Sequence, residues 1–387
     1  MSSYPPSGPP PTTTLRQRLA DLRGPAVPPR PLDARALAAL AANPGCGRRA
    51  LLDGAGVDKT ALAAALGSPA AFGQSQFAII RGNSFEARVK GDGGAELLRL
   101  VHEHLGAGSE PPGPGAQVPD LTAAGPEGRA ARTALALREA TAAAAATGTW
   151  TLLDHPMLAL EVAGSPAYLE PDAVVVHPDG RWTVVEIKSF PMIDGAADAA
   201  KVGAAARQAA VYVLALEKTA GKLASAVVGH TALLVCPKDF SNLPAAAPVD
   251  IRRERAVTRR QLERLTRVEE LAAALPEGLS FDPERTAEEL GEAVAAVSAA
   301  YAPECLAACE LAFHCRERAR AAGEVTALGR SVRGELGALT TVGEALAAAA
   351  GSGSGSGSGG PDDPTAASLH HAARLRAEAL EAAACPC

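Results

Sequence analysis

The feature that most constrains this chain is an apolar hairpin interrupted by charges. Residues 169–190, LEPDAVVVHPDGRWTVVEIKSF, have the pattern of two β-strands joined by the turn residues HPDG. Side chains alternate along a strand, so Glu186 and Lys188 project from the same face at the end of the second strand. Asp172, on the first strand, can lie beside them. The sequence therefore predicts two carboxylates and an ammonium group at one end of a sheet.

Such a group of charges is costly in a sheet unless it holds a cation and handles a charged substrate. Mg²⁺ is a hard cation that prefers oxygen ligands, keeps several waters and needs only a few carboxylates plus substrate phosphate. With Asp172 and Glu186 as ligands, Lys188 could position an attacking water or stabilise charge in the transition state. The alternative is an exposed ion pair at a strand end, which the short Glu-Ile-Lys match does not exclude.

The composition limits the classes of protein that remain. A chain of 387 residues can bury one large core or two smaller ones. It has no uncharged apolar run of about 18 residues, and its first residues lack the apolar core of a secretory signal. We therefore expect a cytoplasmic protein that does not associate with membranes. The formal net charge of −6 argues against polyanion binding over the whole surface but permits local basic faces.

Helical and extended patterns alternate in the middle of the chain. Strand patterns at 149–162, 167–176, 182–190 and 225–236 are preceded by an Ala-rich helical pattern at 127–147 and interrupted by another at 196–218. This order predicts an α/β fold with a mixed sheet. The sequence contains no phosphate-binding loop of the Walker type, which excludes an ATP-driven motor of that class.

The charged hairpin also resembles a known signature. Asp172 preceded by proline and followed by Glu-Ile-Lys at 186–188 looks like the catalytic motif of the PD-(D/E)xK nucleases. QAAVY, from Gln208 to Tyr212, resembles the Q-x-x-x-Y that follows the lysine in RecB-type nucleases. The resemblance implies a restriction-endonuclease-like mixed β-sheet core flanked by helices, with Gln208 and Tyr212 contacting DNA or orienting the site. Taken alone, these two residues fit a helix with a half-buried tyrosine better.

A further helical segment resembles the part of these enzymes that supplies the first metal ligand. RGNSFEARV, at 81–89, places Glu86 where many relatives carry histidine. The resemblance implies that Glu86 is a third metal ligand beside Asp172 and Glu186, with the main-chain carbonyl of Ile187 as a candidate fourth. A solvated helical glutamate is the alternative, and His102 and His104 are runner-up ligands.

The cysteines fit ligation better than a disulfide framework, because they are seven in number and unevenly spaced. Cys305, Cys309 and Cys315 form a C-x₃-C-x₅-C cluster, and Cys46 lies far upstream. This arrangement resembles that of iron–sulfur RecB-like nucleases, which include CRISPR-associated RecB-like exonucleases and the AddB nuclease domain. The resemblance implies a 4Fe–4S cluster on the four thiolates. Tetrahedral zinc is the runner-up, because relatives commonly have C-x₂-C.

The resemblance suggests an order of domains along the chain. We expect a disordered Pro-rich arm at 1–32, an N-terminal helical region at 33–148, a PD-(D/E)xK nuclease core at 149–240, a C-terminal helical region with the cysteine cluster at 241–349, a Gly-Ser linker at 350–360 and a tail helix at 361–387. The cysteine-ligated cluster would join the two helical regions.

The function implied is a Mg²⁺- or Mn²⁺-dependent deoxyribonuclease acting on DNA ends or single strands, with exonuclease action favoured over endonuclease action. DNA repair or defence against foreign DNA would supply its protein partners. The arginine-rich segment 251–267 could follow phosphates or could be a solvated helix surface. Two alternatives remain: a non-catalytic DNA-end- or partner-binding module that keeps the iron–sulfur nuclease fold, and a metal-dependent nuclease acting on RNA.

Overall fold

The structure is a computed structural model that describes residues 11–43, 45–69, 76–106, 108–113, 115–162, 165–223, 226–239, 241–263, 268–352 and 363–384. The chain divides into two compact units. The first comprises Met1–Pro44, Arg49–Val57 and Phe72–Ser280, and the second comprises Gly45–Arg48, Asp58–Ala71 and Phe281–Cys387. Across the described ranges, no helix is both long and apolar enough to cross a membrane.

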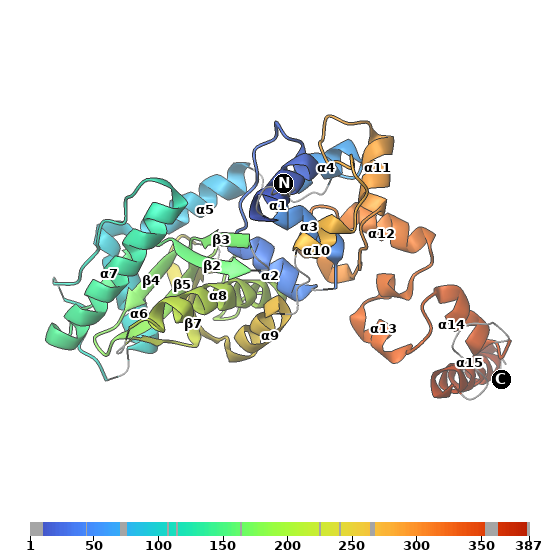
Figure 1. Ribbon diagram of the computed structural model, residues 1–387. Coiled ribbons are helices and arrows are strands. Elements are labelled where there is room, and N and C mark those ends of the chain that lie inside the picture. The colour runs from blue at the N-terminus through green and yellow to red at the C-terminus, as the bar shows by residue number, and fades with distance from the viewer. Residues whose placement is uncertain are drawn as a thin grey trace, which may run out of the picture. The chain divides into compact units, whose positions relative to one another are not determined.

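A six-stranded sheet forms the centre of the first unit (Figure 1). Its order is β1 (Thr151–Asp154), β4 (Ala173–Val176), β5 (Arg181–Ile187), β7 (Thr231–Pro237) and β8 (Pro244–Asp250), with β6 (Val227–Val228) also paired to β5. Strand β5 runs parallel to β6 and β7, and the other pairs are antiparallel. The expected α/β class with a mixed sheet is confirmed, and the sheet is mostly antiparallel.

The predicted hairpin is present as β4 and β5. Val174 pairs with Val184, and the turn closes with a hydrogen bond of 2.9 Å from the Gly180 N–H to the His177 carbonyl. Gly180 has a φ of 78°, a conformation in which a side chain would be strained. All of β4 and nearly all of β5 are buried, because helices cover both faces of the sheet.

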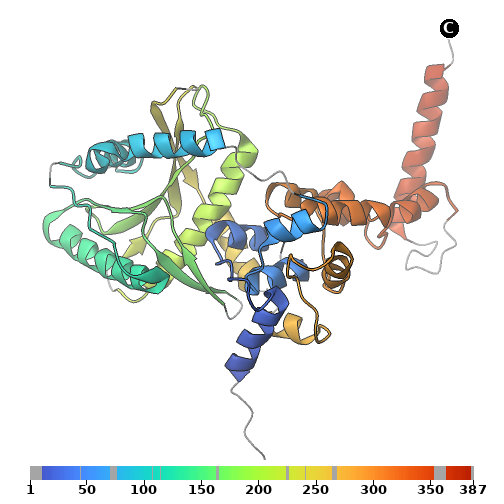
Figure 2. The same cartoon turned by 90° about the horizontal axis from the view of Figure 1, so that it is seen from above.

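Alternate side chains of β5 enter different cores, as the alternation predicts. One core receives Trp182 and Val184 and is closed by α2 (Ala34–Ala42), α7 (Gly125–Thr147) and α8 (Ala199–Ala220). The other receives Val185 and Ile187 and is closed by α5 (Gln76–Val89) and α6 (Gly91–Leu105). Figure 2 shows the sheet between α5 and α6 on one side and α7 on the other. Burial on both faces explains why the strands of the predicted hairpin read as nearly continuous apolar runs.

Two segments that were each expected to form one strand, 149–162 and 167–176, each form parts of two strands. His155 has a φ of 45° and ends β1, so the 149–162 segment continues as β2 (Leu158–Val162). Strand β2 pairs with β3 (Ser165–Leu169) in a separate two-stranded sheet, and the chain then re-enters the main sheet as β4. The break places residues 155 and 170–172 next to each other at one end of the main sheet.

Strand β8 lies at the start of the predicted C-terminal helical region 241–349, so the helices of that region begin later than expected. Its sequence, PAAAPVD, is rich in alanine, but Pro244 and Pro248 are unfavourable inside a helix. Proline is tolerated on an edge strand, and β8 is the last strand of the sheet. The helices α9 (Arg252–Glu263) and α10 (Val268–Ala273) follow it.

The Pro-rich arm also differs from expectation. Helix α1 covers Pro11–Arg23 and Leu22 is fully buried, so this part of 1–32 is ordered, while residues 1–10 lie outside the described ranges. The physical reason is that Leu15, Leu19 and Leu22 recur at helical spacing and bury an apolar side chain. Helix α3 (Gly47–Gly54) begins in the second unit and continues into the first.

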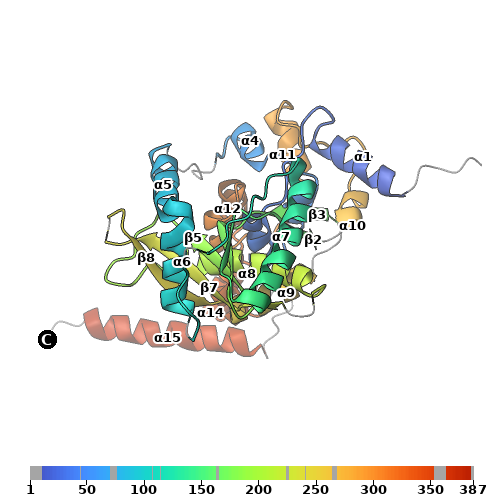
Figure 3. The same cartoon turned by 90° about the vertical axis from the view of Figure 1, so that its left-hand side faces the viewer.

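The second unit is built from helices, of which all but the last are short: α4 (Lys59–Ala65), α11 (Ala287–Ala295), α12 (Ala312–Ala321), α13 (Arg330–Glu335), α14 (Val342–Ala349) and α15 (Pro364–Ala384), with 3₁₀ turns η1 (Pro303–Ala307) and η2 (Val325–Leu328). Figure 3 shows α14 beside the long α15. Ala348 belongs to a small apolar core against which Ala366 and Leu369 of α15 pack. The predicted tail helix is therefore present, while residues 353–362 of the predicted linker and tail lie outside the described ranges.

Candidate active site

The structure brings together the three charged residues of the hairpin. The Lys188 ammonium group forms an ion pair with Oε2 of Glu186 and lies 3.8 Å from Oδ2 of Asp172. The same Asp172 oxygen accepts a hydrogen bond of 2.6 Å from the main-chain N–H of Ile187. Asp172 therefore lies at the end of β5, beside Glu186, where the sequence placed it.

The strand register explains this arrangement. Ala173 of β4 pairs with Val185 of β5, so Asp172, one residue earlier, lies level with the end of β5. The Lys188 N–H donates a hydrogen bond of 2.9 Å to the carbonyl of Val235 on β7, which extends the pairing of these strands past Ile187. The backbone on which the three side chains depend is thus held on both sides by neighbouring strands.

Glu186 is the most unusual group of the site. Its side chain is only 2% exposed, and neither carboxylate oxygen accepts a hydrogen bond of normal geometry within the described part of the chain. Burial raises the pKa of Glu186 to about 7, against the attraction of Lys188, and the nearby Asp172 and Glu86 raise it further. A buried carboxylate with this deficit of donors is a place where a cation would bind favourably.

Lys188 and its neighbour Cys236 are both buried, and burial shifts the pKa of the two groups in opposite directions. Burial lowers the pKa of Lys188, but the attraction of Glu186 and Asp172 outweighs burial and raises that pKa above its ordinary value. Lys188 is therefore an ammonium ion, which donates hydrogen bonds and cannot act as a base. Burial raises the pKa of Cys236 to about 12, so this residue is a neutral core thiol.

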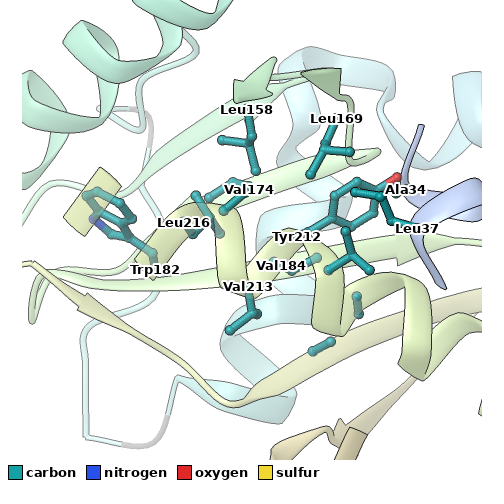
Figure 4. Close-up of a cluster of buried hydrophobic side chains, with 14 of the residues drawn as sticks. Ala34, Leu37, Leu158, Leu169, Val174, Trp182, Val184, Tyr212, Val213 and Leu216 are labelled. Atoms are coloured by element: carbon teal, nitrogen blue, oxygen red, sulfur yellow. The ribbon is translucent and has the colours of Figure 1, made fainter. Parts of the chain in front are cut away.

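Gln208 and Tyr212 connect α8 to the hairpin. The Gln208 amide donates a hydrogen bond of 2.9 Å to the Tyr212 hydroxyl, which donates one of 3.1 Å to the carbonyl of Glu170. Burial raises the pKa of Tyr212, and Glu186 and Asp172 raise it further, so the hydroxyl keeps its proton. Figure 4 shows the Tyr212 ring within the apolar core. Of the two roles that the sequence left open, this geometry favours orientation of the site.

Glu86 reaches the same end of the sheet from α5. Its Oε1 lies 2.6 Å from the ammonium of Lys90 and 3.0 Å from Nε2 of His155. The hydrogen bond from His155 lowers the pKa of Glu86 to about 2, with Lys90 adding to the effect and burial opposing it. Glu86 is also close enough to raise the pKa of Glu186. Oε1 of Glu86 is thus already engaged by Lys90 and His155, and the role of Glu86 as a metal ligand stays a prediction.

Sequence reasoning missed the residues that surround Glu86. Asp154 ends β1, and the following His155 N–H donates to the Asp172 carbonyl over 3.3 Å. Arg129 of α7 donates to the His155 carbonyl over 3.0 Å and forms an ion pair of 2.8 Å with Glu170. The available signal was the Asp-His-Pro sequence between two apolar runs, which is typical of a turn rather than of a continuous strand.

The two histidines considered as runner-up ligands lie on α6. His102 packs edge-on against Trp150, and its Nε2 lies 3.1 Å from the Ser109 carbonyl. His104 is exposed. These contacts give His102 a structural role at the end of the helix.

The four cysteines predicted to bind a cluster all belong to the second unit, although Cys46 is far from the others in sequence. Burial raises the pKa of Cys315; Arg48 opposes the shift, and the nearby Cys46 and Cys305 add to it. Arg48 also donates to Cys315 Sγ over 3.2 Å. Cys309 shares a turn with Cys305, since its N–H donates to the Cys305 carbonyl over 2.8 Å. Cys46 and Cys305 are thus close enough to affect the pKa of Cys315, and Cys309 lies on the turn that follows Cys305.

As these side chains stand, the described residues contain no group of three or more His, Cys, Asp or Glu side chains that could hold a metal ion. The donor sets nevertheless suit the groups that the sequence predicts. Glu186 is a buried carboxylate whose Oε1 accepts no hydrogen bond from the described residues, which suits a hard divalent ion. Thiols with a neighbouring guanidinium N–H donor suit an iron–sulfur cluster or zinc. Cys385 and Cys387 lie outside the described ranges.

Three arginines of the arginine-rich segment 251–267 form ion pairs on α9. Arg252 pairs with Asp250, Arg255 with Glu217 and Arg259 with Glu263. Arg253 and Arg260 are exposed, and Arg264 and Arg267 lie outside the described ranges. The surface available to phosphates within the described helix is therefore smaller than the sequence suggested.

In comparisons with known proteins, the chain matches no protein-family model, no curated protein and no solved structure. The chemistry of the site must therefore be inferred from its own residues. Asp172 and Glu186 offer two adjacent carboxylates, one of them buried, and Lys188 adds a fixed positive charge beside them. This set can hold a divalent ion and orient a phosphate or a water molecule.

Proposed function

We propose that this protein is a metal-dependent DNA nuclease of the RecB-like PD-(D/E)xK type. The observation that carries the proposal is the buried carboxylate of Glu186, whose one ion-pair partner among the described residues is Lys188 and which lies beside Asp172. A single lysine incompletely satisfies two buried or half-buried carboxylates, and cation binding would relieve that penalty.

In this proposal, Asp172 and Glu186 hold Mg²⁺ or Mn²⁺, with the Ile187 carbonyl as a further candidate ligand. The bound ion would supply Lewis-acid polarisation of the scissile phosphate and acidify a water molecule. Lys188, fixed by both carboxylates, would orient the attacking water and stabilise negative charge on the phosphate. Gln208 and Tyr212 would hold the segment that precedes Asp172 through the Glu170 carbonyl.

We further propose that the α/β core is of the restriction-endonuclease-like type and that the second unit carries a 4Fe–4S cluster. The mixed sheet with the carboxylates at the end of its central hairpin supports the first part. Cys46, Cys305 and Cys315, with Cys309 on the adjoining turn, support the second part, and zinc is the alternative metal for the same four thiolates.

The proposed substrate is DNA with free ends or single strands, and the proposed setting is DNA repair or defence against foreign DNA in the cytoplasm. Arg253 and Arg260 are exposed and would contribute positive charge for a phosphate backbone. Comparing the digestion of DNA with that of RNA decides between these two substrates.

The test is digestion of labelled single-stranded DNA, double-stranded DNA and RNA by anaerobically purified protein, with Mn²⁺, with Mg²⁺ and with EDTA. We expect cleavage that requires the metal and that Glu186→Gln abolishes. Glu96→Gln is the matched control, since Glu96 makes an exposed ion pair with Arg99 on α6. Metal-independent cleavage, or full activity of Glu186→Gln, would refute the proposal. Binding of DNA ends without cleavage would instead identify a non-catalytic module.

A further inference from the structure

The ammonium group of Lys90 lies among three potential metal-ligand atoms. It is 2.6 Å from Glu86 Oε1, 2.7 Å from Asp154 Oδ1 and 2.9 Å from His155 Nε2. The Lys90 side chain is only 11% exposed, so its charge is held inside this group. Two carboxylates and an imidazole form a mixed O and N ligand set that suits a first-row divalent metal ion such as Mn²⁺. In this chain, a protein cation fills the position between them.

This group adjoins the proposed metal site through the backbone. Asp154 pairs with Ala173 across β1 and β4, one residue from Asp172. The His155 N–H donates to the Asp172 carbonyl over 3.3 Å, in a left-handed conformation with a φ of 45°. His155 is further held at its carbonyl by Arg129, over 3.0 Å. The backbone that carries Asp154 and His155 is therefore held against the backbone of Asp172.

The carboxylates around Lys90 and the carboxylate of Glu186 differ in how many cationic or hydrogen-bonding partners they have. Glu86 and Asp154 both contact the Lys90 ammonium. At Glu186, by contrast, Oε2 forms an ion pair with Lys188, while Oε1 accepts no hydrogen bond from the described residues, and Lys188 lies 3.8 Å from Asp172. The Lys90 ammonium thus contacts every ligand atom of its position, whereas Lys188 leaves a buried oxygen of Glu186 that still needs a partner.

We propose that Lys90 takes the place of a second divalent ion, so that the site binds a single ion on Asp172 and Glu186. Glu86 is then a ligand of the lysine and not of the metal. Removal of the Lys90 ammonium creates a second metal site from Glu86, Asp154 and His155. This inference rests on the proposed function, because it assumes that the first ion binds beside Glu186.

The test uses the full-length protein and Mn²⁺ alone, without nucleic acid. Isothermal titration calorimetry gives the number of ions bound, and the electron paramagnetic resonance spectrum reports whether two Mn²⁺ ions lie close together. We expect one ion in the wild type, two in Lys90→Met and one in Lys90→Arg, which keeps the positive charge. The double variant Lys90→Met/His155→Ala should return to one ion. Circular dichroism and thermal melting check that each variant is folded.

The outcomes separate this inference from the proposed function. A wild type that binds no Mn²⁺ overturns the proposed function. Two ions in the wild type, or one in folded Lys90→Met, overturn the inference while leaving the nuclease proposal intact. If Lys90→Met does not fold, the number of Mn²⁺ ions bound by Glu86→Gln tests the inference instead. It should keep one bound ion, whereas Glu186→Gln should lose it, and loss of the ion from both variants overturns the inference.

Discussion

Glu186 and Lys188 lie two residues apart at the end of β5, and their side chains form an ion pair in which the carboxylate is almost completely buried. Breaking a buried pair by removing one partner is more costly than breaking an exposed pair, because the other charge is left unsolvated. A substitution of either residue should therefore affect both the stability of the fold and the proposed catalytic activity.

Lys188→Ala should abolish most metal-dependent cleavage while the fold persists. The loss of a fixed donor to developing phosphate charge typically lowers the rate by about 100- to 1,000-fold. Glu186, with a pKa raised to about 7 by burial, can accept a proton when its partner is removed, which limits the damage to the fold. The measurement is the cleavage rate with Mn²⁺, alongside the circular dichroism spectrum. Lys218→Ala, at an exposed position near the end of α8, is the control. Wild-type rates in Lys188→Ala would contradict the proposed role.

His177 should make the first unit less stable in mild acid. Its ring is buried in the β4–β5 turn beside Thr183, and burial, with help from Arg181, lowers its pKa to about 4 from 6.5. The unfolded chain therefore binds a proton that the folded chain does not, and the stabilisation present above pH 6.5 is lost as the pH falls towards 4. The contribution is on the order of 3 kcal/mol. Urea unfolding of wild type and His177→Gln at several pH values measures it. Parallel pH profiles for the two proteins would show that His177 has no such effect.

Tyr212→Phe should weaken the connection between α8 and the segment before Asp172. The variant loses the hydrogen bond to the Glu170 carbonyl and leaves the Gln208 amide without its acceptor, at a cost of about 1 kcal/mol. Because a supporting hydrogen bond holds a ligand in place, we also expect metal affinity to fall by about 10- to 100-fold. Calorimetry with Mn²⁺ measures this loss. Tyr168→Phe, on β3, serves as the control, and equal Mn²⁺ affinities in all three proteins would restrict Tyr212 to a packing role.

Substitution of a cluster cysteine should remove the visible absorbance that we expect from an iron–sulfur cluster. Anaerobically purified wild type should be brown, with broad visible absorbance and with iron and sulfide in its elemental analysis. Cys315→Ser should be colourless and less stable, because the Cys315 thiol lies next to Cys46 and Cys305. Cys236→Ser is the matched control, since that thiol belongs to the apolar core of the first unit. A colourless wild type that contains zinc would replace the iron–sulfur assignment with a zinc site.

The sequence predicted the central site because its signal is local. Alternation along β5 and a short turn place Asp172, Glu186 and Lys188 together without knowledge of any other element. The group around Lys90 could not be predicted in the same way, because α5 and the end of β1 meet only through tertiary packing. Strand β8 was missed because alanine and proline are both uncommon in strands, and only its place at the sheet edge tolerates its prolines.

Arg253 and Arg260 should govern the salt dependence of DNA binding. Both are exposed on α9, whereas the neighbouring Arg252 is engaged by Asp250. Each phosphate contact that releases a counterion from single-stranded DNA adds about 0.7 to the slope of log affinity against log salt concentration. The double variant Arg253→Gln/Arg260→Gln should therefore reduce that slope by about 1.4 if both arginines contact phosphates. Fluorescence anisotropy with a labelled oligonucleotide, with Ca²⁺ replacing Mn²⁺ to prevent cleavage, measures the slope at several salt concentrations.

The control variant Arg252→Gln should leave the slope nearly unchanged, because an arginine already paired with a carboxylate releases fewer counterions when DNA binds. An unchanged slope in the double variant would show that α9 is a solvated surface and that DNA approaches the site from another side.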